Sequence, residues 1–365
     1  MVTQRVKLIA VGDIFLRTRN NKYPFENIKE TLKNKDILFG NLETVLSSKG
    51  KAAEKAVLLY SSPKNAKHLK SADFDVLNIA NNHIFDLGIE GFSNTLDVLY
   101  QNDLTYIGAN NKPGKNYVIL ERKGIKFGFL GYTQGGFSLP EKGIRINKIE
   151  AIDIIKDIEY INPQCEFVII SLHWGTENVF YPSPKQINLA HKLIDAGATV
   201  ILGHHPHVIQ GIERYKTGLI AYSLGNFQFD PKLSYSETNK SIILCLNFDR
   251  KKIESYEIIS VMIDKDFLPG VAEGKLKDKV SDFITKISQS LDDGHLTERW
   301  WFEEIAGEYL SSNMKSWIIR IKKYGIRHFF QCIKWLISPF TIRCYMGFLS
   351  RKLKGRQVKN DQKPY

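Results

Sequence analysis

Five of the nine histidines in this chain directly follow short apolar segments, together with carboxylates and an amide. The histidines are His83, His173, His204, His205 and His207, and the accompanying residues are Asp13, Glu43 and Asn82. Imidazoles mixed with carboxylates and an amide are typical ligands of borderline divalent metals such as zinc, manganese and iron. A lone histidine at a strand end more often makes a structural hydrogen bond, but five at converging positions favour a metal site.

Two of these histidines are separated by a single proline, in the segment His205-Pro206-His207. In a non-helical backbone this spacing lets both rings face the same side, and Pro206 stiffens the chain between them. We therefore expect the two rings to contribute to one site.

Six short, apolar, β-branched segments lead into the polar clusters. They are residues 6–11, 37–39, 76–80, 167–172, 199–202 and 219–222. Short apolar runs without alternation are typical of strands buried on both faces. Between several of these segments, as in 91–101 and 186–196, apolar residues recur at helical spacing. Alternating strands and helices indicate an α/β sheet, whose ligands lie beyond the carboxyl ends of its strands. We expect all six polar clusters at one edge.

The composition is that of an ordinary globular protein, with 43% hydrophobic and 25% charged residues. The four cysteines are scattered and form no C-x-x-C pair, which argues against a thiolate zinc site and fits a reducing compartment. The beginning of the sequence shows no signal-like or membrane-spanning pattern, so we expect a cytoplasmic location. No P-loop, dinucleotide-binding or nucleophile-elbow pattern follows a strand, which argues against those chemistries.

The order of the motifs resembles the bacterial capsule-synthesis CapA (poly-gamma-glutamate synthesis) family. The motifs are Gly12-Asp13, Asn41-Leu42-Glu43, Asn81-Asn82-His83 with Asp86 and Gly88, His173-Trp174-Gly175 with Glu177, Gly203 to His207, and Ser223 to Phe227. Together they cover about residues 5 to 265. The family is more distantly similar to the calcineurin-like metallophosphoesterases. The resemblance implies an α/β fold, a four-layer sandwich of two sheets flanked by helices, with a two-metal centre.

The resemblance also implies roles for individual residues. It assigns one or two divalent ions (Mn, Fe or Zn) to the ligands Asp13, Glu43, Asn82, His173, His205 and His207. Glu43 stands where the phosphoesterases place a bridging aspartate, and Phe15 stands where they place a second histidine ligand. One metal therefore lacks a ligand unless Glu177 or His204 supplies it.

Several residues are candidates for catalysis or substrate binding. His83 is a candidate general acid, and Asp86 either orients the other nitrogen of its ring or caps the turn before Gly88. The candidate substrate or accessory residues are Asn41, Glu177, His204 and Asn226. Glu177 is either a site charge or a solvated loop acid, and Asn226 either contacts substrate or merely forms a turn after Gly225.

Two functions from different classes fit this pattern. The first is a metal-dependent hydrolase acting on a phosphoester, or on a polymer or lipid-linked intermediate of cell-surface polymer assembly. The second is a non-catalytic, metal-containing component of a polymer synthesis or export assembly.

The chain divides into three expected regions: the metallophosphatase-like domain at 1–269, a helical extension at 270–312 and a basic tail at 313–365. The net charge of +12 lies in the tail, which holds 13 of the 51 Lys and Arg residues but only one of the 39 acidic residues. The neutral body and the lack of a recognition motif argue against nucleic-acid binding.

The tail between 329 and 349 is rich in large apolar residues but is broken by Pro339 and contains Lys334 and Arg343. This pattern predicts two amphipathic helices lying on an anionic membrane surface, at the inner face of the membrane, rather than a membrane span. The alternative is that these helices pack on the body or form an oligomer contact.

Overall fold

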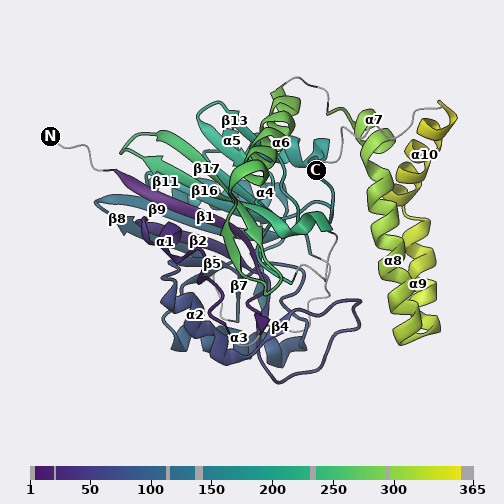
Figure 1. Ribbon diagram of the computed structural model, residues 1–365, viewed down its shortest axis with the longest axis horizontal. Helices are drawn as coiled ribbons and strands as arrows, with labels where there is room; N and C mark the ends of the chain where they lie inside the picture. Colours follow the sequence, from purple (N-terminus) through teal and green to yellow (C-terminus); the bar gives the residue numbers. More distant parts are fainter. Residues whose placement is uncertain are drawn as a thin grey trace.

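The computed structural model describes residues 5–19, 22–111, 116–135, 143–230, 236–292, 294 and 296–354. Two large sheets pack face to face, and helices cover their outer faces (Figure 1). The four-layer α/β sandwich implied by the sequence motifs is confirmed.

The first sheet has the strand order β18-β17-β16-β1-β2-β5-β6, with β15 paired to the end of β1. Its strands are β1 (Val6–Ile14), β2 (Ile37–Leu42), β5 (Val76–Asn78), β6 (Tyr106–Ile107), β15 (Asn226–Gln228), β16 (Lys240–Phe248), β17 (Ile253–Ile263) and β18 (Pro269–Val271). Neighbouring strands from β1 to β6 run parallel, whereas β16, β17 and β18 extend the sheet antiparallel. The parallel half therefore carries the predicted strand ends.

The second sheet has the order β13-β14-β12-β11-β9-β8. Its strands are β8 (Tyr117–Arg122), β9 (Ile125–Thr133), β11 (Phe167–His173), β12 (Val200–His204), β13 (Ile212–Tyr215) and β14 (Gly218–Ala221). The four inner strands are parallel, and β8 and β13 are antiparallel edges. Two small ribbons pair β3 (Val45–Leu46) with β4 (Tyr60–Ser61) and β7 (Ala109–Asn110) with β10 (Arg145–Ile146).

The central strands of both sheets, such as β1, β2, β11 and β12, are buried on both faces, which explains their unalternated apolar sequences. Between the sheets, Phe39 stacks on Phe129 with ring centroids 6.0 Å apart. The outer faces are covered by α1 (Lys29–Lys33), α2 (Ala66–Ser71) and α3 (Gly88–Gln101) on one side and by α4 (Ala151–Ile161) and α5 (Pro184–Asp195) on the other. Each fully buried large apolar side chain contributes roughly 1.5–3 kcal/mol, so the strands form a rigid support for the residues at their ends.

The last part of the described chain is helical. After α6 (Gly274–Asp292), which packs on β13 and β17, come α7 (Glu298–Trp300), a π-helical turn (Trp301–Ile305), α8 (Ala306–Tyr324), α9 (Ile326–Leu336) and α10 (Pro339–Leu353). We call residues 298–353 the C-terminal helices. The expected break at Pro339 is confirmed, since this residue begins α10. The expected boundary between 312 and 313 falls inside α8.

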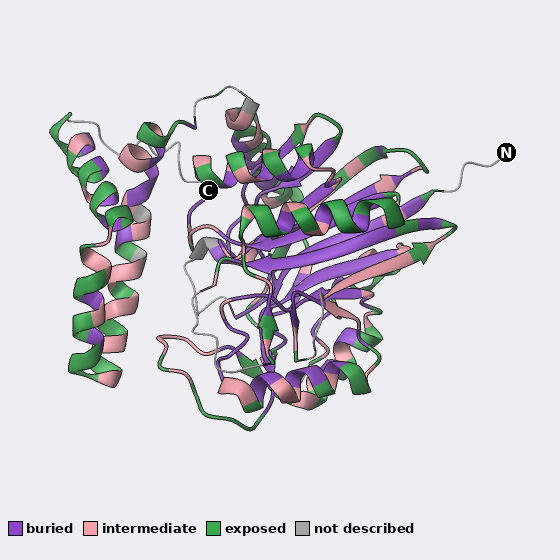
Figure 2. Cartoon of the chain, turned by 180° about the vertical axis from the view of Figure 1, so that it is seen from behind, coloured by how far each residue is buried: buried purple, intermediate pink, exposed green. Residues whose placement is uncertain are grey.

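The C-terminal helices project from the sandwich, with α9 and α10 lying one after the other along α8 (Figures 1 and 2). At one end, buried Trp301 donates a hydrogen bond from Nε1 to the Tyr181 carbonyl oxygen at 3.2 Å. At the other end, the Tyr324 hydroxyl donates to the Lys55 carbonyl oxygen at 3.0 Å. Among the described residues, no helix is both long and apolar enough to cross a membrane.

Candidate metal centre

The polar clusters meet at the carboxyl-terminal ends of the parallel strands. Asp13 lies near the end of β1, Glu43 directly follows β2, and His173 and His204 end β11 and β12. The strand register pairs Asp13 with Asn41 and His173 with His204. Because the two pairs belong to different sheets, the site lies where the ends of the two sheets face each other.

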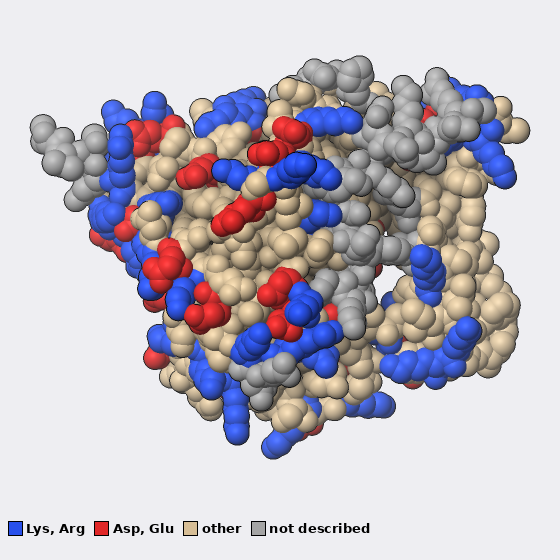
Figure 3. All heavy atoms as spheres, in the orientation of Figure 1, with Lys and Arg blue, Asp and Glu red and all other residues tan. Residues whose placement is uncertain are grey.

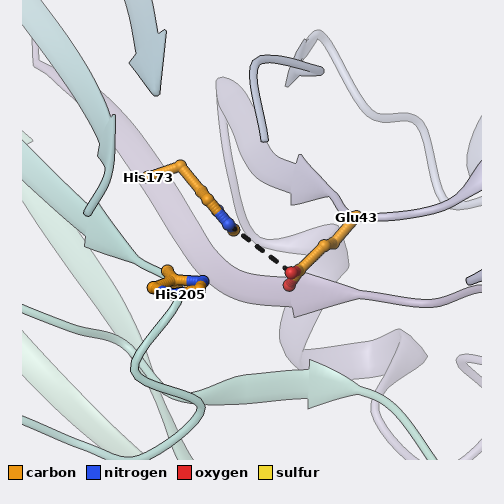
Figure 4. A group of neighbouring side chains, drawn as sticks. All are labelled: Glu43, His173 and His205. Atoms are coloured by element: carbon orange, nitrogen blue, oxygen red, sulfur yellow. Dashed lines mark ion pairs between the residues drawn. The ribbon is translucent and has the colours of Figure 1, made fainter. Parts of the chain in front are cut away.

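Glu43 occupies the centre of the site. Its side chain is fully buried, with Oε1 3.5 Å from His173 Nε2 (Figure 4) and Oε2 3.8 Å from His207 Nδ1. Neither oxygen accepts a hydrogen bond from any residue that the structure describes. A buried carboxylate without such partners is costly, and burial raises the pKa of Glu43 well above its usual range. A cation between this carboxylate and the histidines would offset that cost.

Two groups of potential metal ligands share Glu43. One group consists of Glu43, His173 and His205, and the other consists of Asp13, Glu43 and His207. Within each group the ligand atoms lie within 4.8 Å of one another. One Glu43 oxygen faces each group, and a carboxylate can share its two oxygens between two ions. The residues present therefore fit two divalent cations.

Hydrogen bonds fix the orientation of Asp13. Asn41 Nδ2 donates to Asp13 Oδ1 at 2.8 Å, and Asn78 Nδ2 in turn donates to Asn41 Oδ1 at 2.9 Å. His204 Nδ1 lies 3.4 Å from Asp13 Oδ1. Burial raises the pKa of Asp13, but the interactions with His204 and His207 outweigh it, so the pKa falls well below its usual range. Asn41 and His204 therefore support Asp13.

An unusual backbone places the two histidines around Pro206. His205 and His207 have φ angles of 94° and 59°, in the left-handed region that costs about 1–3 kcal/mol. Their ring centroids lie 5.8 Å apart. Burial lowers the pKa of His205 to about 4, which leaves its ring neutral at pH 7. Burial also lowers the pKa of His207, but the negative charges of Glu43 and Asp13 outweigh this and raise it to about 10.

Asn226 orients His207. Its Oδ1 lies 2.9 Å from His207 Nδ1, and its Nδ2 donates to the Thr238 carbonyl oxygen at 3.1 Å. Asn226 begins β15 and is not the turn residue; the preceding Gly225 has the positive φ of 75° that the turn requires. The turn-forming alternative for Asn226 is therefore wrong, because a glycine already supplies that conformation.

His83 is held at the edge of the site by a buried aspartate. Its Nδ1 lies 2.5 Å from Asp86 Oδ2, and its Nε2 lies 3.9 Å from Glu43 Oε1. Asp86 also accepts hydrogen bonds from Lys55 Nζ at 2.7 Å and from the Leu59 backbone at 2.6 Å. The side chain of Asp86 makes no capping bond at the start of α3, so the structure favours the orienting alternative.

The remaining predicted residues lie on the same side. Asn82 Oδ1 is 2.9 Å from His173 Nε2, next to the first ligand group. Glu177 forms a third potential ligand group with His205 and His207. Of the two residues proposed to complete the ligand set, Glu177 therefore has the suitable position, whereas His204 belongs to none of the three groups.

A pocket of about 490 Å³ opens above these residues. Its floor and walls include Asn82, His83, Glu177, His205 and His207. Four further residues come from α8, namely Lys315, Ser316, Ile319 and Arg320. The C-terminal helices thus form one wall of the pocket.

Sequence reasoning missed three features of the site. Lys55 comes from a long loop that shows no pattern, so nothing in the sequence indicates its bond to Asp86. Asn78 carries a usable signal, because it is a polar residue inside an apolar strand. The contribution of α8 depends on tertiary packing across more than 100 residues of chain, which no local pattern encodes.

Comparisons with known proteins agree with the motifs. Residues 7–231 match the family described as bacterial capsule synthesis protein PGA_cap. The chain is 31% identical over 306 residues to the capsule biosynthesis protein CapA of Bacillus anthracis, covering 78% of this chain and 74% of that protein. It is 30% identical over 285 residues to the PGA biosynthesis protein CapA of Bacillus subtilis, covering 75% and 74%.

Solved structures with similar coordinates include two 5'-nucleotidases. The precursor from Thermus thermophilus has a TM-score of 0.47 at 12% identity and covers 71% of this chain and 54% of that one. The enzyme from Candida albicans has a TM-score of 0.46 at 14% identity and covers 80% and 59%. The family match over residues 7–231, together with the two relatives, shows that this chain belongs to the bacterial capsule-synthesis family PGA_cap, as the motif order predicted.

Proposed function

We propose that this chain is a metal-dependent hydrolase of capsule or related cell-surface polymer synthesis, acting on a phosphoester or on a polymer or lipid-linked intermediate. The observation that carries the proposal is Glu43, a buried carboxylate without hydrogen bonds that directs one oxygen toward each of two ligand groups. The polymer context comes from the names of the relatives, which are capsule and PGA biosynthesis proteins.

The proposed division of the ligands follows the two groups. Asp13 and His207 would hold one cation, His173, His205 and Asn82 would hold the other, and Glu43 is placed between the two groups. When bound, such a pair lowers the pKa of a bound water and stabilises the oxygens of an in-line displacement. The network of Asn41, Asn78 and Asn226 keeps the ligand side chains in one orientation.

We assign the role of general acid to His83. Its side chain lines the pocket and Nδ1 is fixed by Asp86, so the protonated ring can pass a proton from Nε2 to the leaving oxygen of a bound substrate. Burial raises the pKa of Asp86, but the interactions with His83 and with Lys55 outweigh it and lower the pKa, which keeps the carboxylate ionised. His83 thus has the fixed orientation that acid catalysis requires.

The test is turnover by manganese-loaded, full-length protein on phosphomonoesters, phosphodiesters and amide polymers. His83→Ala is expected to keep its metal and to lose turnover by roughly a hundredfold to ten-thousandfold. His68→Ala is a matched control, because His68 lies on α2 outside this pocket. If metal-loaded wild-type protein turns over no substrate, the hydrolase proposal is wrong and the non-catalytic role in a polymer assembly replaces it.

The C-terminal helices support a second proposal, peripheral binding to an anionic membrane surface. On α9 and its C-cap, one set of exposed apolar side chains is Ile326, Phe329, Phe330, Ile333 and Ile337. On α10, where Phe340 and Phe348 are also exposed, a second set is Ile342, Met346, Leu349 and Leu353. Both sets recur at helical spacing and form one stripe on each helix. The buried positions hold small or polar residues, such as Cys332, Thr341 and Cys344. The usual burial pattern of a surface helix is therefore inverted.

Basic residues accompany the stripes. Lys322, Lys323 and Arg327 lie where α8 meets α9, and Figure 3 shows Lys and Arg side chains gathered at this end of the helices. Each basic residue near an anionic bilayer contributes about 1 kcal/mol, and the apolar stripes can insert between the headgroups. Charge and exposed apolar area together favour a lipid surface as the binding partner of these helices.

A further inference from the structure

The wall of the pocket opposite the metal centre carries a positive charge that the proposed chemistry does not use. Arg320 on α8 lines the same pocket as His205 and His207. Its Nε is buried and has no hydrogen-bond partner among the described residues. Its guanidinium lies over the Trp317 ring, 5.0 Å from the centroid, which holds it in place.

Desolvation of this guanidinium is costly, because a buried donor without an acceptor forfeits its bonds to water. Burial lowers the pKa of Arg320, and the negative charge of Glu177 opposes this effect. No ion pair within 4.0 Å joins the two residues in the described part of the chain, so Glu177 does not neutralise Arg320 by a direct salt bridge.

The α8 helix contributes the positive charges of Lys315 and Arg320 to the pocket. The lining also includes Lys55, which is paired with Asp86, and the acid Glu177. A planar guanidinium with several donors recognises phosphate or carboxylate oxygens in a bidentate manner. The pocket volume of about 490 Å³ is large enough for a ligand that extends from the metal centre to α8.

We propose that Arg320 forms an anion subsite, which binds a second phosphate or carboxylate of the substrate, away from the bond that is cleaved. The inference rests on the proposed function of the metal centre and narrows its substrate class to molecules with two anionic groups. Because α8 lies outside the family match at 7–231, this subsite is a specificity element supplied by the C-terminal helices.

The test uses two ligands that cannot be hydrolysed at a phosphoester bond, methylphosphonate with one anionic group and methylenediphosphonate with two. Calorimetric titration of manganese-loaded, full-length protein is expected to show tighter binding of methylenediphosphonate. Arg320→Gln is expected to weaken that binding on the order of tenfold to a hundredfold, while methylphosphonate binding changes less than about twofold. Arg320→Lys is expected to restore part of the affinity.

Lys322→Gln is the matched control, since it removes the same charge from α8 without lining the pocket. Glutarate, titrated in parallel, distinguishes a carboxylate from a phosphate as the second group. Metal content is measured after each titration, so that loss of the ions is not mistaken for loss of the subsite. If the ligand with two anionic groups binds no better than the other, or if Arg320→Gln affects neither, the inference is wrong. Absence of turnover alone would reject hydrolysis and leave the subsite intact.

Discussion

Two regions depart from ordinary burial in opposite ways: the edge of the sandwich that carries the candidate metal ligands, and the C-terminal helices. At the edge, Glu43 and Asp13 are fully buried although they are acidic. On the helices, Ile337 and Met346 are 64% and 65% exposed although they are apolar. Folded proteins usually avoid both, so each exception is a candidate binding feature. The difference teaches that departures from ordinary burial, in either direction, mark the two places where we propose ligands: a cation at the first and a lipid surface at the second.

The close packing of the sandwich edge can be tested at Gly12. A Cβ at this position would lie 1.8 Å from the carbonyl oxygen of Gly225, which belongs to the backbone that carries Asn226. Gly12→Ala is therefore expected to destabilise the fold by about 3 kcal/mol or more, measured by urea unfolding. Gly270→Ala is the control, because its nearest contact is an ordinary 3.6 Å. Equal stability of the two variants would contradict the close packing described here.

A smaller effect is expected from the residues that orient the metal ligands. Asn226→Ala removes the partner of His207 Nδ1, and the loss of such an orienting hydrogen bond typically lowers metal affinity tenfold to a hundredfold. Competition with a fluorescent chelator measures this change. Asn247→Ala provides the control, because Asn247 is a half-buried asparagine of β16 that bonds to Ser255 and lies outside the site. Unchanged affinity in Asn226→Ala would show that the ligand geometry does not depend on this amide.

Much of the edge that carries the candidate metal ligands could be predicted from the sequence, because the end of each buried strand is marked by a change from apolar to polar residues. Apolar runs that stop at Asp13, Glu43 and His173 indicate buried parallel strands, and parallel strands bring their carboxyl ends together. The left-handed backbone at His205 and His207 was not accessible, because neither residue type requires it.

For the C-terminal helices, the sequence predicted the helices themselves but not their contribution to the pocket. Helical spacing and the break at Pro339 are local features, so the sequence predicted both helices and their richness in large apolar residues. The position of Arg320 in the pocket depends on how α8 is anchored at Trp301 and Tyr324, and these anchors contact residues far away in the sequence. Such contacts leave no periodic signal.

The smallest expected effect concerns the exposed stripes. The double variant Phe330→Ser, Ile337→Ser is expected to weaken sedimentation with anionic phosphatidylserine vesicles by about tenfold, since it removes two exposed apolar side chains from α9. The control is Tyr100→Ser, Ile152→Ser, which removes two exposed apolar side chains from the sandwich. Binding is also expected to fall at high salt. Equal binding of both double variants, or no binding by wild-type protein, would leave packing or self-association as the role of the stripes.

The most direct test of the central claim is the number of divalent ions bound per chain. Full-length protein purified without chelator and loaded with manganese is expected to hold two ions by elemental analysis, and chelation is expected to lower its melting temperature, because ligands that bind the native state stabilise it. Glu43→Gln is expected to lower the count while circular dichroism remains unchanged, since Glu43 is the residue that the two ligand groups share. Metal-free wild-type protein, or a Glu43→Gln variant that binds two ions as tightly as wild type, would contradict the account.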